Sequence, residues 1–462
     1  MKITVLGSGP GGYIAALKAA RMGAEVVVVE DREIGGTCLN RGCIPTKTLL
    51  ASSELYGKMK NMAAFGFHLD GRIRPDLKKI MERKEKIIAV QARGIHSLFK
   101  SWGVQLKEGK GELLSNRHVL VRSKGREETI TSDCIVIATG SRGGRMPNIP
   151  VDGKKILSPT DALELTEIPE SMLIIGAGVM GCEFASIYSE LGTEVTMVEL
   201  LPRALAGEDE EISALMEREL KKKKIKLIKE AKPDKVQICS DGVHTFISNS
   251  REVVTDKVLL TIGRDFNSEG IGLKKVGIKT GGRGEIGVDR RMSTNIAGVY
   301  AIGDVTGGML LAHTASSEAV VAAVNIFGGT AAMDYNAVPT AIFTTPEIAS
   351  VGLREHQLKE LNRNFITGHF QYRALGKAHA IGEISGVFKV LADRKTDRLL
   401  GVHIIGPHAS DIIHEAALAI RFNLNVKDLA KTIHAHPTLA EGLGGAAEDV
   451  WGESIYSPRE KV

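Results

Sequence analysis

Two copies of one pattern constrain this chain more than any other feature. In each copy, a short run of aliphatic residues leads into a GxGxxG segment, and a helix-forming stretch and a second strand follow. The first copy runs from residue 2 to Glu30, and the second runs from residue 173 to Glu199. A strand, a glycine turn, a helix and a strand that ends in an acid form the dinucleotide-binding βαβ fingerprint. The chain is therefore predicted to be an α/β protein with two Rossmann-like domains that bind two dinucleotides.

The glycines and the acids have separate tasks in each copy. Gly9 lets the backbone approach a pyrophosphate at a helix N-terminus, and Glu30 accepts a hydrogen bond from a ribose hydroxyl. Glu199 stands where the 2′-phosphate of NADP would meet a carboxylate, which favours NAD as the second dinucleotide. Arg203 follows closely, but Pro202 intervenes, so we interpret this arginine as a surface residue. The residues expected at the two turns are Gly7, Gly9, Gly12 and Glu30 in the first copy, and Gly176, Gly178, Val179, Gly181 and Glu199 in the second.

Composition narrows the class of protein. A chain of 462 residues is too long for one hydrophobic core, so two to four domains are expected. The net charge of +5 does not argue for nucleic acid, and the lysine run 221–224 is expected on a solvated helix face. Five cysteines are too few for a secreted disulfide scaffold. A strand follows Met1 at once, which leaves no room for a signal peptide, and no apolar run approaches the roughly 18 residues of a membrane span. A cytoplasmic location is expected.

The segment 35–47, GGTCLNRGCIPTK, places four residues between Cys38 and Cys43. In an undistorted helix the two would lie about 7.5 Å apart along the axis, beyond the roughly 4.4–6.8 Å Cα separation of disulfides. A bond between them would need a distorted helix start, and a strained, accessible disulfide is readily reduced. Lys47 adds a cation that would lower a nearby thiol pKa. Two unrelated cysteines or half a zinc site is the alternative, but no CxxC pair completes such a site, and no metal is expected.

These motifs, in this order, resemble the flavoprotein disulfide reductases, and among them the dihydrolipoamide dehydrogenases. The resemblance covers nearly the whole chain. It implies that Cys38 and Cys43 form a redox-active disulfide, in which Cys38 is the sulfur attacked by the substrate and Cys43 lies on the flavin. It also implies that Lys47 lies near the flavin and pairs with Glu183.

The resemblance assigns the flavin site to two separated parts of the chain. In the family, an ATG segment, here 138–140, closes the first part, and the aspartate of a second motif, here 299–304, binds the ribityl chain. A helix that starts near residues 309–313 would direct its N-terminal amides at the flavin ring. The further residues expected at FAD are Gly36, Thr37, Gly111, Thr139, Gly140, Asp304, Leu311 and Ala312, and Gly263 is expected on the NAD side.

Four segments follow from this resemblance. They are an FAD-binding domain (1–147), an NAD-binding domain (148–264), a return to the FAD-binding or central domain (265–335) and an α+β dimerisation domain (336–462).

Near the end, an HPT sequence carries His436, and Glu441 follows five residues later, which supplies a base and the carboxylate that orients it. His434 is expected to pack or hydrogen-bond locally. The family places the catalytic histidine across the dimer axis from the disulfide, so a homodimer is expected.

The implied reaction is the oxidation of protein-bound dihydrolipoamide through the disulfide and one non-covalent FAD per subunit, with reduction of NAD+ to NADH. The implied partner is a lipoyl-bearing acyltransferase or carrier protein of a 2-oxoacid dehydrogenase or glycine cleavage system, with no nucleic acid and no membrane. A glutathione-type reductase is an alternative, but it expects NADP and commonly an aromatic residue at Val179. A mercury reductase needs a C-terminal cysteine pair, and no cysteine follows Cys239. A structural flavoprotein subunit of a complex would leave the cysteines and the histidine–glutamate pair unexplained together.

Overall fold

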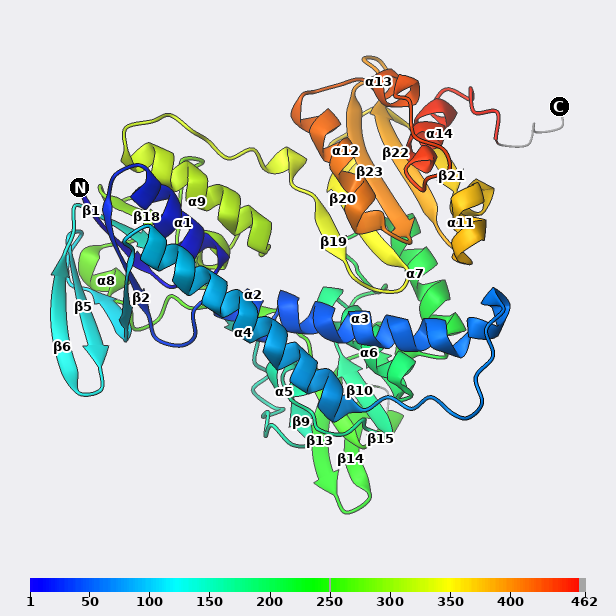
Figure 1. The fold of residues 1–462 in the computed structure, drawn as a ribbon, viewed down its shortest axis with the longest axis horizontal. Coiled ribbons are helices and arrows are strands. Elements are labelled where there is room, and N and C mark those ends of the chain that lie inside the picture. Colours follow the sequence, from blue (N-terminus) through cyan, green and yellow to red (C-terminus); the bar gives the residue numbers. More distant parts are fainter. Residues whose placement is uncertain (249–250, 457–462) are drawn as a thin grey trace.

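The computed structural model describes residues 1–248 and 251–456, and Figure 1 shows three bodies of helices and strands. The predicted α/β class is confirmed, because two five-stranded parallel sheets and one five-stranded antiparallel sheet form the centres of these bodies. Within the described residues, no helix is both long enough and apolar enough to cross a membrane.

The first body contains a parallel sheet whose strands come from both sides of a long insertion. The strand order is β18–β7–β1–β2–β3. The strands are β1 (Lys2–Leu6), β2 (Glu25–Glu30), β3 (Gln105–Glu108), β7 (Cys134–Ile137) and β18 (Val299–Ala301). Helices α1 (Pro10–Arg21) and α9 (Ala312–Ile326) pack against each other beside the sheet. Helix α1 begins at Pro10, directly after Gly9, because proline is pre-organised for the first helical turn.

The second body repeats this plan with the strand order β12–β11–β10–β16–β9. Its elements are β9 (Ile156–Leu157), α5 (Pro159–Ala162), β10 (Ser171–Ile175), α6 (Val179–Leu191), β11 (Glu194–Val198), α7 (Glu210–Lys222), β12 (Lys226–Ile228) and β16 (Lys257–Leu260). In both sheets the strand before the glycine turn has a parallel neighbour on each side, so the turn opens at the point where the strand order reverses. Ligands of doubly wound sheets bind at this point.

One expectation about the second body is wrong in part. The lysine run at the end of α7 is not wholly solvated, because Lys223 is half-buried and its Nζ lies 3.8 Å from Glu190. Burial lowers the pKa of Lys223. The other three lysines of the run are exposed or half-exposed, so the expected solvated face holds for most of the run.

Shorter antiparallel sheets extend both parallel sheets. They contain β4 (Lys110–Leu113), β5 (His118–Ser123) and β6 (Arg126–Thr131) in the first body, and β13 (Pro233–Cys239), β14 (Gly242–Ile247) and β15 (Arg251–Thr255) in the second. A two-stranded ribbon, β8 (Ser141–Gly143) with β17 (Arg264–Phe266), forms where the chain leaves the first body and where it returns. After the return come α8 (Leu273–Val276) and the 3₁₀ turn η2 (Gly303–Thr306).

A pair of long helices spans the first and second bodies (Figure 1). The short helix α2 (Gly36–Arg41) leads into α3 (Cys43–Lys60), and after the turn η1 (Met62–Phe65) the chain returns as α4 (Leu77–Ser101). Helix α3 packs against α6 of the second body. In α4 the buried Lys84 donates from Nζ to the Leu163 carbonyl at 2.6 Å, which joins this helix to the second body.

The third body is an antiparallel sheet with the strand order β19–β20–β23–β22–β21 and helices on its faces. Its elements are η3 (Tyr335–Ala337), β19 (Thr340–Ile342), β20 (Glu347–Gly352), α10 (Glu355–Glu360), β21 (Phe365–Gln371), η4 (Tyr372–Ala374), α11 (Gly376–Ile381), β22 (Val387–Asp393), β23 (Leu399–Gly406), α12 (Ala409–Arg421), α13 (Val426–Lys431) and α14 (Glu441–Asp449). Its core is apolar and is formed by the sheet together with α12, α13 and α14.

Buried charges fix the third body to the second. Lys389 of β22 is 2% exposed, and its Nζ donates to Asp209 at 2.8 Å and to Glu355 at 2.6 Å. Asp209 also accepts from the Glu211 amide at the start of α7. A buried cation with two carboxylate partners resists removal of any one of them, because the remaining charge would be desolvated and unpaired.

Candidate active site

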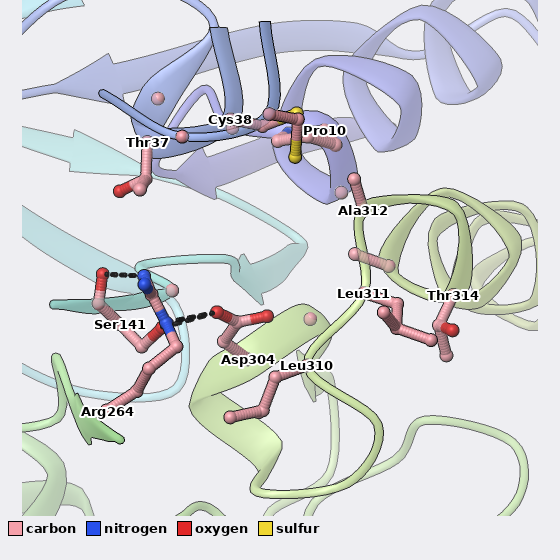
Figure 2. Close-up of a pocket in the computed structure, with 18 of the residues that line it drawn as sticks. Pro10, Thr37, Cys38, Ser141, Arg264, Asp304, Leu310, Leu311, Ala312 and Thr314 are labelled. Atoms are coloured by element: carbon pink, nitrogen blue, oxygen red, sulfur yellow. Dashed lines mark hydrogen bonds and ion pairs between the residues drawn. The ribbon is translucent and has the colours of Figure 1, made fainter. Parts of the chain in front are cut away.

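A cavity of about 1990 Å³ is lined by both glycine turns, by the cysteine segment and by one face of helix α12. Pockets for one small ligand usually measure roughly 300–1,000 Å³, so this cavity has room for more than one. Figure 2 shows part of it, with Pro10 and Cys38 on one wall, Asp304 opposite them, and Ala312 at the N-terminus of α9.

The first glycine turn leaves an open approach to the backbone. A Cβ added to Gly9 would meet nothing within 4 Å, so this peptide faces the cavity directly. A Cβ on Gly7 would lie 2.4 Å from the Ala138 carbonyl oxygen, and one on Gly12 would lie 2.0 Å from the Gly7 carbonyl oxygen. Gly9 is therefore open for a diphosphate at the N-terminus of α1, while Gly7 and Gly12 allow the helix to pack on the sheet.

The second turn repeats this arrangement at the N-terminus of α6. A Cβ on Gly178 would meet nothing within 4 Å, whereas one on Gly176 would lie 2.7 Å from the Thr261 carbonyl oxygen and one on Gly181 only 2.0 Å from the Gly176 carbonyl oxygen. The geometry of both turns suits a dinucleotide diphosphate. The donor set at each turn, an open backbone at a helix N-terminus beside a strand-end carboxylate, fits a dinucleotide such as FAD or NAD.

The acids at the strand ends are held by backbone amides. Glu30 accepts from the Ser8 amide at 2.7 Å, and Glu199 accepts from the Ala177 amide at 2.6 Å and from the Leu201 amide at 2.9 Å. Arg203 donates to Glu210 at 2.9 Å and to the Ala206 carbonyl, so its guanidinium is already paired. Each carboxylate is therefore fixed in place at the edge of its turn.

Asp304 lies on the wall opposite Cys38, and two neighbouring residues of the β8–β17 ribbon hold it there (Figure 2). Ser141 donates from its hydroxyl to the Asp304 carboxylate, and Arg264 lies 3.3 Å from the same carboxylate. Arg264 also donates to the Ser141 hydroxyl at 2.6 Å. Sequence reasoning missed Arg264 and Ser141, although Arg264 directly follows Gly263 at the end of an expected strand.

Glycine makes the approach of the two cysteines possible. Helix α2 ends at Arg41 and α3 begins at Cys43, with Gly42 between them outside helical geometry (φ −139°, ψ −114°). The expected distortion at the helix start is thus a complete break. A Cβ on Gly36 would lie 2.6 Å from the Gly9 Cα, so the cysteine segment packs directly on the first glycine turn.

The two sulfurs, both unbonded in the structure, differ in acidity. A hydrogen bond from the Cys38 thiol lowers the pKa of Cys43 to about 7, and the cation of Lys47 acts in the same direction. The same hydrogen bond raises the pKa of Cys38, and burial adds to this. Cys43 is therefore the thiolate of the pair, and Cys38 is the thiol that donates to it.

Lys47 joins the cysteine segment to the second body. Its Nζ lies 2.8 Å from Glu183 Oε1 on α6 and 4.4 Å from the centre of the Phe343 ring. Glu183 is almost fully buried and also accepts from the Phe343 amide at 3.0 Å. The ammonium group is thus held beside the cysteines by an anion and an aromatic face. Sequence reasoning missed Phe343.

His436 and Glu441 form a second, separate cluster. Glu441 accepts from His436 Nδ1 at 2.9 Å and from the Thr438 amide at 2.8 Å. Burial alone would raise the pKa of Glu441, but the Thr438 amide and His436 outweigh it, so the pKa is lowered. The His436 side chain is 76% exposed. His434, in contrast, pairs locally with Glu415 at 3.1 Å.

The cavity brings together most of the residues singled out from the sequence. The lining includes Gly7, Gly9, Glu30, Gly36, Thr37, Cys38, Cys43, Lys47, Gly111, Thr139, Gly140, Gly178, Val179, Glu183, Gly263, Asp304, Leu311 and Ala312. Glu199 borders a smaller hollow at the second turn. Gly12, Gly176 and Gly181 lie behind the turns, where they allow close packing. Among the described residues, His436 and Glu441 do not line the cavity within one chain.

Comparison with known proteins gives a consistent result over the whole length. The sequence profile of the pyridine nucleotide-disulphide oxidoreductases matches residues 1–319, and that of their dimerisation domain matches residues 338–447. Dihydrolipoyl dehydrogenase from Bacillus subtilis is 40% identical, over 98% of each chain, and mitochondrial dihydrolipoyl dehydrogenase 2 from Arabidopsis thaliana is 39% identical, over 98% of this chain and 91% of the relative. The crystal structure of LpdA from Mycobacterium tuberculosis superposes with a TM-score of 0.92 at 30% identity, over 97% of this chain and 99% of that one.

Proposed function

The chain belongs to the pyridine nucleotide-disulphide oxidoreductase family, and from this premise we propose that it oxidises dihydrolipoamide and reduces NAD+, with FAD as its cofactor. The observation that carries this proposal is the Cys38–Cys43 pair, polarised into thiol and thiolate at the wall of a cavity that two dinucleotide turns share.

The residues at the first turn and at Asp304 would hold FAD. Gly9 and the N-terminus of α1 would receive the diphosphate, Glu30 the adenosine ribose and Asp304 the ribityl chain. When bound there, FAD would supply the two-electron chemistry that links the dithiol to NAD+. The N-terminal amides of α9 carry partial positive charge and would favour the reduced, anionic cofactor. Gly178, Val179 and Glu199 would hold NAD at the second turn.

In the thiol steps, residues of the chain transfer the protons and form and break the sulfur–sulfur bonds. Only a thiolate attacks a disulfide, so a base must first take the proton of the substrate thiol. His436 is assigned this role, because Glu441 at Nδ1 leaves Nε2 free to accept a proton. The substrate sulfur then bonds to Cys38 and the bond to Cys43 breaks, which leaves Cys43 as a thiolate. The second substrate thiol then displaces the Cys38 sulfur, which leaves as a thiol with the proton of that second thiol, and the lipoyl disulfide closes.

The dimerisation domain supports a homodimer, and we propose that the base comes from the partner subunit. His436 lies outside the cavity of its own chain and is exposed, and several large apolar residues of the third body are exposed too. These are Leu418, Phe422, Leu424 and Ile433. Exposed apolar groups of this extent are typical of a surface that another chain covers. One site would then combine Cys38 and Cys43 of one chain with His436 and Glu441 of the other.

The four-part division is likewise a proposal. We assign residues 1–147 and 265–335 to the FAD-binding part, 148–264 to the NAD-binding part and 336–462 to dimerisation. The lipoyl group is proposed to come from an acyltransferase or carrier protein of a 2-oxoacid dehydrogenase or glycine cleavage system, in the cytoplasm. Among the relatives named above, two carry the activity in their names.

Steady-state turnover tests the proposed reaction. The purified holoenzyme should reduce NAD+ with dihydrolipoamide, and should give little turnover with glutathione or with NADP+. Cys43→Ser should abolish dithiol turnover while Cys134→Ser, at a half-buried cysteine outside the cavity, leaves it unchanged. Preference for glutathione and NADP+ would instead identify a glutathione-type reductase.

Coenzyme choice is expected to depend on Glu199. Replacing it with alanine and adding an arginine in place of Leu200 should shift the NAD:NADP preference by one or more decades toward NADP, since a mispaired charge costs several kcal/mol. The ratio of kcat/KM values for the two coenzymes measures this shift. An unchanged NAD:NADP preference would show that a group other than Glu199 distinguishes the two coenzymes at the ribose.

A further inference from the structure

Metal-ligand side chains meet at the tip of the β13–β14 hairpin, which projects from the second body (Figure 1). A sulfur, an oxygen and a nitrogen, from Cys239, Asp241 and His244, all lie within 4.8 Å of one another. Thiolate, carboxylate and imidazole are the donors that Zn²⁺ and similar divalent d-block ions take in proteins. None of the three lines the active-site cavity, so the dithiol chemistry does not account for them.

The hairpin register brings these donors together before any ion is bound. Cys239 pairs with Gly242 as the last rung of the ladder, so Asp241 lies in the two-residue turn. His244 follows Gly242 by two residues along β14, and residues two apart in a strand face the same side. The cysteine and the histidine therefore share one face, next to the turn that carries the aspartate.

The imidazole is oriented from the neighbouring strand. Glu252 of β15 contacts His244 Nδ1 at 2.6 Å, while His244 Nε2 lies 3.0 Å from Asp241. Metal-bound histidines almost always hold a carboxylate or carbonyl at the second ring nitrogen, which fixes the tautomer and raises ligand basicity. Glu252 occupies that place, and Nε2 faces the aspartate side of the cluster.

We propose that the hairpin tip binds one divalent d-block cation, with Zn²⁺ as the representative ion, through Cys239 Sγ, the Asp241 carboxylate and His244 Nε2. Ligand bonds of 2.0–2.3 Å place tetrahedral donors about 3.3–3.8 Å apart. The widest present separation is at most 4.8 Å and needs to close by only about 1 Å, while the aspartate and the imidazole, 3.0 Å apart, are already near enough. Cys239 and His244 are half-buried and Asp241 is exposed, which leaves a fourth position for water. Binding releases the thiol proton and any proton on Nε2 to solvent.

Calorimetric titration of ZnCl₂ into the FAD-loaded Cys38→Ser/Cys43→Ser dimer tests this site, because the active-site sulfurs can no longer compete. One Zn²⁺ per subunit is expected. Cys239→Ser and His244→Gln should each lower the affinity at least 100-fold, and Glu252→Gln should lower it 10- to 100-fold through the lost orientation of the imidazole. Cys134→Ser is the matched control and should bind as its parent does. With CoCl₂, a sulfur-to-metal absorption band should appear and should be absent in Cys239→Ser.

Zinc bound equally by the parent and by Cys239→Ser, or no binding in the parent, would overturn the proposal and identify the cluster as a surface ion pair of His244 with its two carboxylates. An unchanged KM for NAD+ in an otherwise wild-type Cys239→Ser enzyme confirms that the second body is intact. Dihydrolipoamide turnover of that variant should also be unchanged, since the hairpin tip lies outside the cavity.

Discussion

At the scale of single residues, the acidity of Cys43 depends on two neighbours. Its pKa of about 7 rests first on the Cys38 thiol and then on the ammonium group of Lys47. A thiol whose pKa is lowered is a thiolate above that pKa and loses its charge as the pH falls through it. In the reduced protein the thiolate should therefore appear near pH 7 and disappear in acid.

Lys47→Met should move this titration to higher pH, because the removed cation leaves the Glu183 carboxylate beside the sulfur. At pH 7 we expect about tenfold less thiolate than in the wild type. Ultraviolet thiolate absorbance against pH, in the reduced enzyme, measures the change, and Lys58→Met, at an exposed lysine near the other end of α3, is the control. An unmoved midpoint would show that the Cys38 thiol alone sets the acidity.

A second residue, Glu318 of α9, supports the turn that carries Asp304, which we propose binds the flavin. It is 1% exposed, accepts from the Gly303 amide at 2.6 Å through Oε2 and from the Tyr335 hydroxyl at 2.8 Å through Oε1. Burial raises its pKa. Because Gly303 precedes Asp304, the Glu318 carboxylate fixes the turn that carries the proposed ribityl ligand to helix α9, which borders the proposed flavin site.

Glu318→Ala should weaken FAD retention at least tenfold, since it leaves a buried amide and a buried hydroxyl without partners, at about 1–3 kcal/mol each. Glu318→Gln should restore most of the affinity, because its carbonyl can accept from Gly303 while its amide donates to the tyrosine oxygen. Ser316→Ala, at a hydroxyl that bonds only to its own helix, is the control. The measurement is the dissociation constant of FAD from each apoprotein. Equal constants for the Glu318→Ala and wild-type proteins would show that Glu318 does not support FAD binding.

At the scale of elements, strand β23 carries a buried histidine at the contact between the second and third bodies. His403 donates from Nε2 to the Leu353 carbonyl at 3.0 Å, and its Nδ1 has no partner in the described structure. Burial lowers its pKa to about 4, against the opposing effect of Asp209. Between about pH 6.5 and 4, the His403 imidazole therefore binds a proton in the unfolded chain but not in the native protein.

This difference predicts a loss of stability in mild acid. The contribution is complete above about pH 6.5 and is lost as the pH falls toward 4, with about 2 kcal/mol gone at pH 5. His403→Gln keeps a donor for the Leu353 carbonyl and does not titrate, so it should lose less stability between pH 7 and 5. Urea unfolding of the holoenzyme dimer at a fixed protein concentration gives both values. Equal losses in the two proteins would exclude His403 as the titrating group.

Sequence predicted the elements well where one local pattern fixes them and less well where contacts come from afar. Both βαβ units follow from their aliphatic runs and glycine turns. The break at Gly42 agrees with the distorted helix start that a bond between Cys38 and Cys43 would need, because two cysteines five residues apart cannot bond within a regular helix. In contrast, no local pattern predicts Arg264, Phe343 or Glu318, because their partners lie more than ten residues away in the chain. The half-burial of Lys223 depends on Glu190 of another helix for the same reason.

At the scale of the whole molecule, the separation of His436 from the cavity predicts a shared site. Mixing Cys38→Ser chains with His436→Gln chains should restore up to half of the activity per heterodimer, because one of the two sites then has an intact disulfide and an intact base. Each variant alone should be inactive in dithiol turnover. Subunit exchange after mild dissociation, followed by the dihydrolipoamide assay, tests this. Heterodimers that form and stay inactive would place base and disulfide in the same chain.

The strand order of the first sheet also has a consequence for how the protein is made. Edge strand β18 pairs with β7, but the ribosome completes it only 164 residues after β7 ends, when all of the second body has already been synthesised. At about 5–20 residues per second, the first sheet waits roughly 8–30 seconds for its last strand, and the flavin wall formed by Asp304 and α9 arrives later still. A chain made only up to residue 264 would already contain the whole second glycine turn and its strands, yet it would lack Asp304 and α9 of the proposed flavin site. We therefore expect FAD to bind only late in synthesis, after the second body has been made. A shortage of riboflavin would then leave the protein incomplete at a late stage of assembly.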